Sequence, residues 1–344
     1  MMTSIDFGSY EIRCAFRDRT DVKCLSLRTE RSEYAILPSQ DTYRSTLSDQ
    51  HISYADCDDS IVVFGSRASK VRWLSRIPCA PLFSDGMVPT DDAPARQILN
   101  ILTKAMLPTR AGDLRECWFT SPGGSSSTNI EFLSRLIRMH GFVPHHCNSG
   151  EAVMLSAGSD NQFTGISIVM GAETCQISIT RYGIDLASET LHVGGNWIDT
   201  ELAKQFRIQV WDDNGACYLD LNEVRDWKHD PERHLRNAVD EKERVLARLY
   251  GVVLDQIART VKSLLRTVSV IPAMKGLRLN VVCAGGPVQV NGFSSGLTER
   301  FVDNDIADRI VSIRIAPDPS TAVVRGLLIQ GELHRRREGE RKVA

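Results

Sequence analysis

The sequence lacks any long hydrophobic run, any paired-cysteine motif and any marked excess of one sign of charge. No stretch reaches the roughly 18 consecutive apolar residues of a transmembrane helix, so we expect no membrane span, and membrane contact has no support. The start, Met1-Met2-Thr3-Ser4, runs directly into an apolar segment, which predicts no signal peptide. The net charge of −2 excludes the overall basic field of a nucleic-acid-binding protein. These absences together predict a cytoplasmic protein.

The nine cysteines are scattered, and none forms a Cys-x-x-Cys pair. Several of them, such as Cys14, Cys175 and Cys283, lie in apolar runs that are typical of strands. Buried thiols in a reducing compartment explain this distribution better than disulfides or zinc ligands. The one basic cluster lies in residues 334–344, which we interpret as a solvated polar tail.

Two segments share one pattern, and each lies in a different half of the chain. Residues 4–16 and residues 168–179 each contain an apolar strand, a tight turn with a glycine and a hydroxyl residue, and a second alternating strand. A hairpin turn of this kind points backbone N–H groups and a hydroxyl into one concavity, which suits phosphate oxygens. The pair predicts two related domains that hold one polyphosphate between them.

The length of 344 residues predicts two domains. We expect domain I in residues 1–158, with a small insertion at about 30–75, and domain II in residues 159–333. Domain II is expected to contain an insertion at about 208–235, followed by helices to about residue 268. Helices alternate with strands in both halves, which predicts an α/β architecture with mixed sheets.

Two helices have clear boundaries in the sequence. Asp91-Asp92 is expected to cap a helix from about Ala93 to Met106, with Pro94 in the first turn, where its missing N–H costs little. A second helix is expected from about Thr128 to His140, because apolar residues recur at helical spacing.

The order of these landmarks resembles the actin-like ATPase superfamily, and within it the filament-forming MreB and MamK branch of bacterial actins. The resemblance covers about residues 4 to 333 and rests on five short segments in the family's order. It implies an actin/Hsp70-type fold of duplicated ribonuclease-H-like domains around a central nucleotide cleft. It also implies ATP and Mg²⁺ as ligands.

The first two segments carry the expected catalytic residues. Asp6-Phe7-Gly8-Ser9 resembles the first phosphate loop, where the acid holds hydrated magnesium and Gly8, Ser9 and the adjacent Tyr10 lie near the phosphates. Magnesium prefers carboxylate and water oxygens, which an acid at this position supplies. Glu151-Ala152 resembles the start of the connecting helix, whose first residue orients the attacking water. The family's acid-proline pair is here acid-alanine.

The third segment resembles the second phosphate loop but departs from it. Gly171 and Thr174 fit the pattern, whereas Val169 stands where the family has an aspartate, and Ala172 and Glu173 replace glycines. A glutamate near phosphates repels them unless it turns away or shares the magnesium. Two interpretations follow: a nucleotide site with altered metal binding and slow hydrolysis, or a degenerate site with weak or no binding.

The last two segments are expected to flank the nucleoside. A glycine pair that opens a helix places free N–H donors toward an anion, and the second insertion occupies the region where relatives contact ribose and purine. The adenosine loop has a proline in place of a third glycine, which removes one N–H group. The residues that the resemblance implies here are Gly194, Gly195, Asn196, Asp199, Glu223, Lys228, Gly285, Gly286 and Pro287.

The sequence supports two classes of function. The first is a cytoskeletal ATPase that binds ATP-Mg²⁺, hydrolyses it slowly and assembles with itself into filaments. The second is an adaptor or scaffold of the same fold with little turnover, which Val169 and the lost glycines favour. A small-molecule kinase is a third reading, for which Asp199 is the only acid that we can nominate. The sequence leaves the choice between ATP and GTP open.

Overall fold

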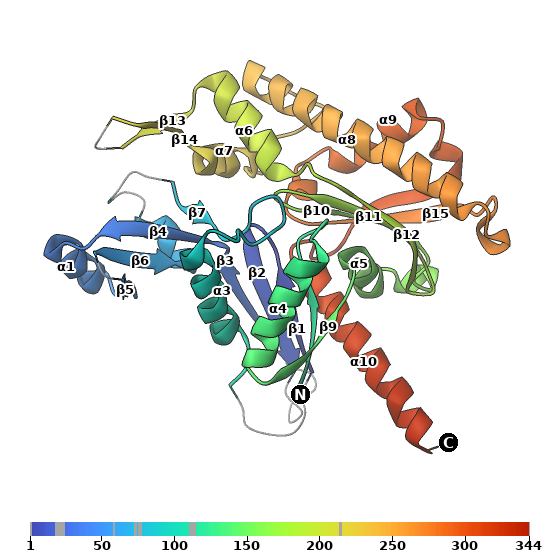
Figure 1. Cartoon of the computed structure of the whole chain (residues 1–344). Coiled ribbons are helices and arrows are strands. Elements are labelled where there is room, and N and C mark those ends of the chain that lie inside the picture. The colour runs from blue at the N-terminus through green and yellow to red at the C-terminus, as the bar shows by residue number, and fades with distance from the viewer. Residues whose placement is uncertain are drawn as a thin grey trace.

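The computed structural model describes residues 2–17, 25–57, 59–71, 74, 78–109, 115–212 and 215–343. The strand that follows the first hairpin begins at Leu25, and residues 18–24 lie outside the described residues. Two five-stranded mixed sheets form the centre of the molecule (Figure 1). The α/β class with mixed sheets is therefore confirmed.

The first sheet has the strand order β3-β2-β1-β8-β9. β1 pairs antiparallel with β2 and parallel with β8, and β9 extends the parallel part. The antiparallel part is a meander that ends in β3. The strands are β1 Met2–Phe7, β2 Glu11–Arg17, β3 Leu25–Arg31, β8 Arg115–Thr120 and β9 Phe142–His146.

The second sheet repeats the same topology in the order β12-β11-β10-β15-β16. Its first strand starts 163 residues after β1, at Gly165 against Met2, so the duplication read from the sequence is also a duplication of structure. Both first strands are buried along nearly their whole length because each sheet is covered on both faces. The strands are β10 Gly165–Met170, β11 Cys175–Arg181, β12 Ile184–Leu191, β15 Leu279–Ala284 and β16 Ile310–Ile315.

Helices cover one face of each sheet with separate hydrophobic cores. On the first sheet these are α3 Ala93–Met106 and α4 Ser127–Met139, and on the second α6 Gly195–Phe206, α8 Glu241–Val268 and α9 Phe293–Asp303. The boundaries expected for α3 are confirmed, and the Asp92 carboxylate accepts the Ala95 N–H as its cap. No described helix is long and apolar enough to cross a membrane.

The opposite faces of the two sheets share a third core, formed by α5 Ser149–Ala157 and α10 Ala322–Val343. α10 follows the second sheet in sequence but crosses beneath the first one (Figure 1). There the Ser4 hydroxyl donates to the Val324 carbonyl at 2.8 Å, which joins the first strand to the last helix. Residues 334–343, expected as a polar tail, continue this helix.

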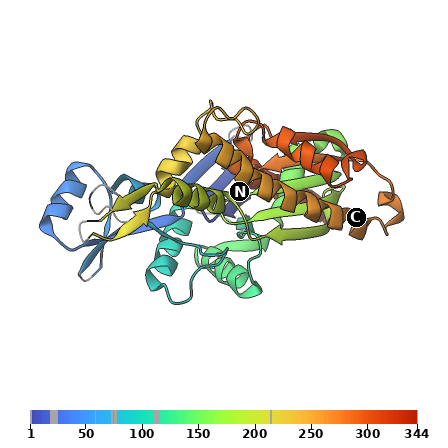
Figure 2. The same ribbon diagram turned by 90° about the horizontal axis from the view of Figure 1, so that it is seen from above.

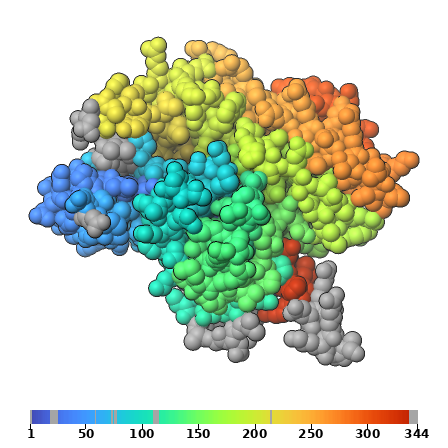
Figure 3. Space-filling view, viewed as in Figure 1, coloured from blue at the N-terminus to red at the C-terminus, as the bar shows by residue number. Residues whose placement is uncertain are grey.

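Each half carries an insertion. The first is a small sheet of order β5-β6-β4-β7 with its own core, and the second is a β-hairpin followed by α7. Both insertions lie at the same end of the molecule (Figures 1, 2 and 3). The elements are β4 Glu33–Pro38, α1 Asp41–Asp49, β5 Ala55–Cys57, β6 Ser60–Phe64, the 3-10 helix Gly65–Val71, β7 Ala80–Pro81, β13 Gln209–Trp211, β14 Cys217–Leu219 and α7 Leu221–Lys228.

Candidate functional site

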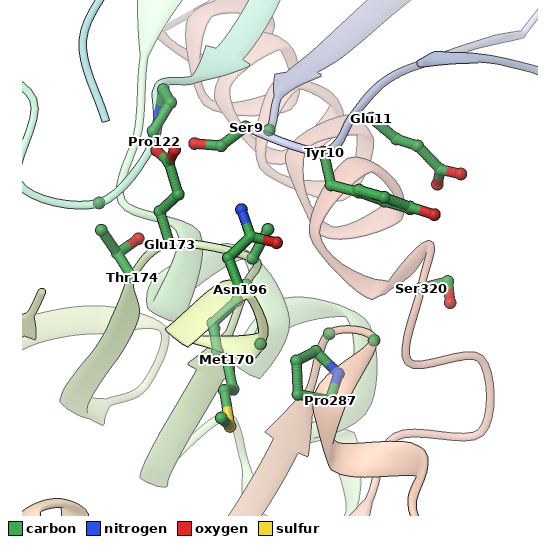
Figure 4. Close-up of a pocket in the computed structure, with 18 of the residues that line it drawn as sticks. Ser9, Tyr10, Glu11, Pro122, Met170, Glu173, Thr174, Asn196, Pro287 and Ser320 are labelled. Carbon is green, nitrogen blue, oxygen red and sulfur yellow. The ribbon is translucent and has the colours of Figure 1, made fainter. Parts of the chain in front are cut away.

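A cleft of about 350 Å³ lies between the two sheets and is lined by both repeated turns (Figure 4). The structure brings together most of the site residues expected from the sequence, from both halves of the chain. Those that line the cleft are Asp6, Gly8, Ser9, Tyr10, Gly171, Ala172, Glu173, Thr174, Gly195, Asn196, Asp199, Lys228, Gly285, Gly286 and Pro287.

The two turns have the same backbone geometry. The Gly8 N–H donates to the Glu11 carbonyl at 3.2 Å, and the Gly171 N–H donates to the Thr174 carbonyl at 2.8 Å. Each hydrogen bond closes a two-residue hairpin loop between antiparallel strands. The residues at the two apices are therefore Ser9 with Tyr10 and Ala172 with Glu173.

Asp6 is the next-to-last residue of β1, and it lines the cleft. The Thr120 hydroxyl donates to Asp6 Oδ1 at 2.8 Å, and Arg13 Nη1 lies 4.0 Å from Asp6 Oδ2. Burial raises the pKa of Asp6, while Arg13 and the hydrogen bond from Thr120 act in the opposite direction. Arg13 also pairs with Glu11, and it is a cleft residue that the sequence reasoning missed.

The donor set suits magnesium only when phosphate oxygens complete it. Among the described residues, no three His, Cys, Asp or Glu side chains are grouped so that they could hold a metal ion. Asp6 offers one carboxylate, and Val169 occupies its position in the second repeat. Magnesium is commonly bound through one or two carboxylates, water and substrate phosphates. A hydrated ion that enters with a polyphosphate therefore fits this site.

Glu173 lines the cleft, and its carboxylate bonds to the other half of the molecule. The Gly86 N–H donates to Glu173 Oε2 at 3.0 Å. In Figure 4 the Glu173 side chain extends toward the loop that carries Pro122. The adjacent Thr174 is buried and packs closely against that loop. A Cβ at Gly123 would lie only 3.0 Å from Thr174 Oγ1.

The glycine pair Gly194-Gly195 at the start of α6 packs against the second turn. The first two N–H groups of α6 donate to carbonyls of that turn. The Gly195 N–H donates to the Gly171 carbonyl at 3.0 Å, and the Asn196 N–H donates to the Ala172 carbonyl at 2.7 Å. A Cβ at Gly194 would lie 2.5 Å from the Ala172 carbonyl oxygen, so this position requires glycine for close packing. The Gly195 N–H is therefore not the free donor that was expected, and Gly194 does not line the cleft.

Asp199 lies in a buried ionic cluster between α6 and α7, beside the cleft. Its carboxylate pairs with Lys228 Nζ and with Arg225 Nε, the latter at 3.3 Å. Burial lowers the pKa of Lys228, and the Asp199 charge opposes that shift. The sequence reasoning missed Arg225, although its spacing of three residues from Lys228 places both on one face of α7. Glu223, expected near the ribose, is exposed and does not line the cleft.

The loop after β15 uses its two glycines differently. Gly285 has a φ of +103°, and a Cβ there would lie 2.0 Å from the Met170 carbonyl oxygen, so this glycine permits packing on β10. A Cβ at Gly286 would meet nothing within 4 Å, which leaves open space in front of the cleft wall. Pro287 begins a 3-10 turn, and its carbonyl accepts the Tyr250 hydroxyl at 2.9 Å.

Glu151 lies in a hollow that adjoins the cleft, and it does not line the cleft itself. Gln330 Nε2 donates to Glu151 Oε2 at 3.3 Å. Burial raises the pKa of Glu151, and the bond from Gln330 opposes that shift. Ser121–Gly123, Ser149 and Gln176 line both spaces, so the hollow that contains Glu151 is a direct neighbour of the cleft.

Solved structures with the same fold are actin-like proteins. MreB 5 of Spiroplasma citri bound to AMPPNP superposes with a TM-score of 0.70 at 14% identity, covering 98% of each chain. A MamK double helical filament gives a TM-score of 0.69 at 16% identity, covering 96% of this chain and 99% of that one. The ethanolamine utilization protein EutJ from Carboxydothermus hydrogenoformans gives 0.54 at 16% identity, with 95% and 89% covered.

These likenesses confirm the actin-like ATPase fold that the five sequence segments predicted. No curated protein sequence matches the chain. One family model does match, and it extends over residues 1–331, which includes both sheets, both insertions and the cleft between them. The chain therefore belongs to the Volactin family.

Proposed function

We propose that this protein is a cytoskeletal ATPase that binds ATP with Mg²⁺ in the central cleft and assembles into nucleotide-dependent filaments. The observation that carries the proposal is the pair of equivalent hairpin turns, one from each half, that line one cleft above Asp6. Proteins of the same fold support it, because MreB 5 of Spiroplasma citri is seen bound to AMPPNP and MamK is seen as a double helical filament. The two halves, 1–158 and 159–333, would close on the nucleotide.

The residues that line the cleft would contact different parts of the nucleotide. Ser9 and Thr174 supply hydroxyls at the phosphate end, and Arg13 adds a positive charge beside Asp6. Gly286 and Pro287 offer a flat wall for the nucleoside. Asp6 would hold magnesium through water, and the ion would neutralise charge on the phosphate oxygens.

Hydrolysis is expected to be slow for two structural reasons. Val169 supplies no second carboxylate at the phosphate end. Glu151, the residue proposed to orient the attacking water, lies in the adjoining hollow and is hydrogen-bonded to Gln330. A general base must come within hydrogen-bond reach of its water, directly or through a second water. Closure of the two halves is the step that would bring it there.

Titration and sedimentation test the two parts of this function separately. Calorimetry with ATP and Mg²⁺ should show binding, and ATP or AMPPNP should move the protein into the pellet at high speed. Head-to-tail contacts that do not close into a ring give such polymers. A protein that binds no purine triphosphate, or that stays monomeric at high concentration with both nucleotides, would contradict the proposal.

The second candidate is an adaptor or scaffold with the actin-like shape and little turnover. The hydrophobic Val169 and the engagement of Glu173 with Gly86 favour it, because both remove acidic groups from the metal end of the cleft. A purified protein without ATPase activity that recovers a stable partner protein would support this candidate over the first.

A further inference from the structure

We infer that Glu173 is a positioning residue whose carboxylate ties the second phosphate turn to the other half of the molecule and slows nucleotide release. This inference deepens the proposed function and rests on it for the release step. The bond itself is tested by a separate measurement that needs no nucleotide.

The bond joins segments that are distant in sequence and lie on opposite sides of the cleft. Glu173 lies at the apex of the β10–β11 turn, and Gly86 lies 87 residues earlier, after the small sheet of the first half. A hydrogen bond to a charged group is stronger than one between neutral groups. The carboxylate therefore forms a cross-cleft connection at the phosphate end.

The donor side of this bond is held firmly. Ser84 and Met87 exchange backbone hydrogen bonds of 2.8 and 3.0 Å around Gly86, whose φ is +74°. The Gly86 carbonyl accepts from Ser125 Oγ at 2.7 Å and from Asn129 Nδ2 at 3.3 Å. The N–H group of Gly86 is thus fixed by the start of α4.

The acceptor side is equally restrained. The Gly171 N–H closes the turn that carries Glu173, and the first two amides of α6 bind the carbonyls of Gly171 and Ala172. A movement of this turn must therefore move α6 with it. The Glu173–Gly86 bond consequently couples α6 of the second half to α4 of the first half.

The same bond explains how a glutamate is tolerated beside phosphates. Like charges repel strongly at short range in a partly buried site. The Gly86 N–H draws the carboxylate across the cleft and away from the turn apex that would meet the phosphates. The competing role is that Glu173 shares the metal with Asp6, and a glutamine at this position separates the two.

The experiment compares Glu173→Ala with Glu173→Gln in the full chain. Glutamine keeps an oxygen acceptor but loses the charge, whereas alanine loses both. Glu189→Ala is the matched control, because Glu189 is an exposed glutamate of the same half that does not line the cleft. Thermal melting of each variant checks that it is folded.

The first measurement is hydrogen exchange of the Gly86 amide without nucleotide. Loss of a hydrogen bond to a charged group corresponds to about tenfold faster exchange or more in Glu173→Ala. Glu173→Gln should stay within about threefold of the original protein, and Glu189→Ala should match it. Unchanged exchange in Glu173→Ala would overturn the inference.

The second measurement is the dissociation rate of a fluorescent ATP analogue with Mg²⁺. Release should be about tenfold faster in Glu173→Ala and close to the original rate in Glu173→Gln. Equal acceleration in both variants, with equal loss of Mg²⁺ dependence, would overturn the positioning role in favour of metal sharing. A protein that binds no nucleotide but loses Gly86 protection in Glu173→Ala would refute the proposed function and still support the cross-cleft bond.

Discussion

Arg225 lies over the ring of Tyr10, with 4.4 Å between its Cζ and the ring centroid. Tyr10 lies in the first hairpin turn and Arg225 in α7 of the second half, so this contact also crosses the cleft. Arg31 lies 3.6 Å from the same centroid, and the Asp199 carboxylate holds Arg225 from the other side. Two cross-cleft contacts, at Tyr10 and at Glu173, therefore join the halves.

Replacement of Tyr10 tests the first of these contacts. A cation over an aromatic ring contributes about 1 kcal/mol in a partly exposed site. Tyr10→Leu should lower the free energy of unfolding by about this amount and weaken ATP binding severalfold, because α7 is no longer held to the turn. Tyr10→Phe keeps the ring and should behave like the original protein. Denaturant unfolding and calorimetry measure both effects, and equal loss in Leu and Phe variants would contradict the role of the ring.

Asp6→Asn should raise stability and remove the metal at the same time. Because burial raises the pKa of Asp6, the folded protein binds this proton more tightly than the unfolded chain does. The ionised carboxylate therefore lowers stability at neutral pH, and this cost disappears as the pH falls toward its ordinary pKa of 3.8.

Unfolding at a series of pH values checks the Asp6 prediction. Asp6→Asn should be more stable than the original protein at pH 7 and equal to it near pH 4, and Mg²⁺ should no longer strengthen its ATP binding. A variant that is less stable at pH 7 would show that the partners of Asp6 stabilise its ionised form. A variant that keeps its Mg²⁺ dependence would show that Asp6 has no metal role.

Glu151→Gln should reduce turnover without weakening nucleotide binding. A positioned general base contributes on the order of 100-fold or more, so kcat should fall by about that factor while Kd for ATP changes little. Since burial raises the pKa of Glu151, the original enzyme should lose activity as the pH falls through a value above 4.5, and the variant should lack that limb. A steady-state pH profile measures this, and unchanged turnover would remove Glu151 from the mechanism.

Val169→Asp should speed hydrolysis if the missing second carboxylate limits it. Val169 lies in β10 and lines the cleft, so an aspartate there would face the same space as Asp6. We expect turnover to rise about tenfold, together with a loss of stability of about 1–3 kcal/mol because Val169 packs on the shared core. Val169→Asn is the control without charge. No increase with aspartate would mean that the turn limits hydrolysis for another reason.

The sequence predicted the parts of the site that are local. Asp6, Gly8 and Gly171 fall where expected because a strand end followed by a two-residue loop is specified by adjacent residues. The duplication was also readable, since it repeats one short pattern. Local spacing predicted α3 correctly from its cap and its apolar periodicity.

Contacts between distant segments were not readable from the sequence. The pair Gly194-Gly195 has the pattern of an anion site. In the structure, however, the N–H groups of Gly195 and Asn196 donate to carbonyls of the second hairpin turn. Glu173 and Arg225 each contact a residue of the other half, Gly86 and Tyr10, and no local pattern indicates these two contacts. The placement of Glu151 in an adjoining hollow depends in the same way on Gln330 at the end of the chain.

The bond between Ser4 and Val324 has a consequence for how the chain is made. A ribosome releases the first strand early, yet one face of that strand is covered by a helix that begins at residue 322. During almost all of synthesis the nascent N-terminal half must expose this apolar surface, a condition that favours aggregation or chaperone capture. Truncation near residue 320 would remove α10 and leave this face of β1 permanently exposed.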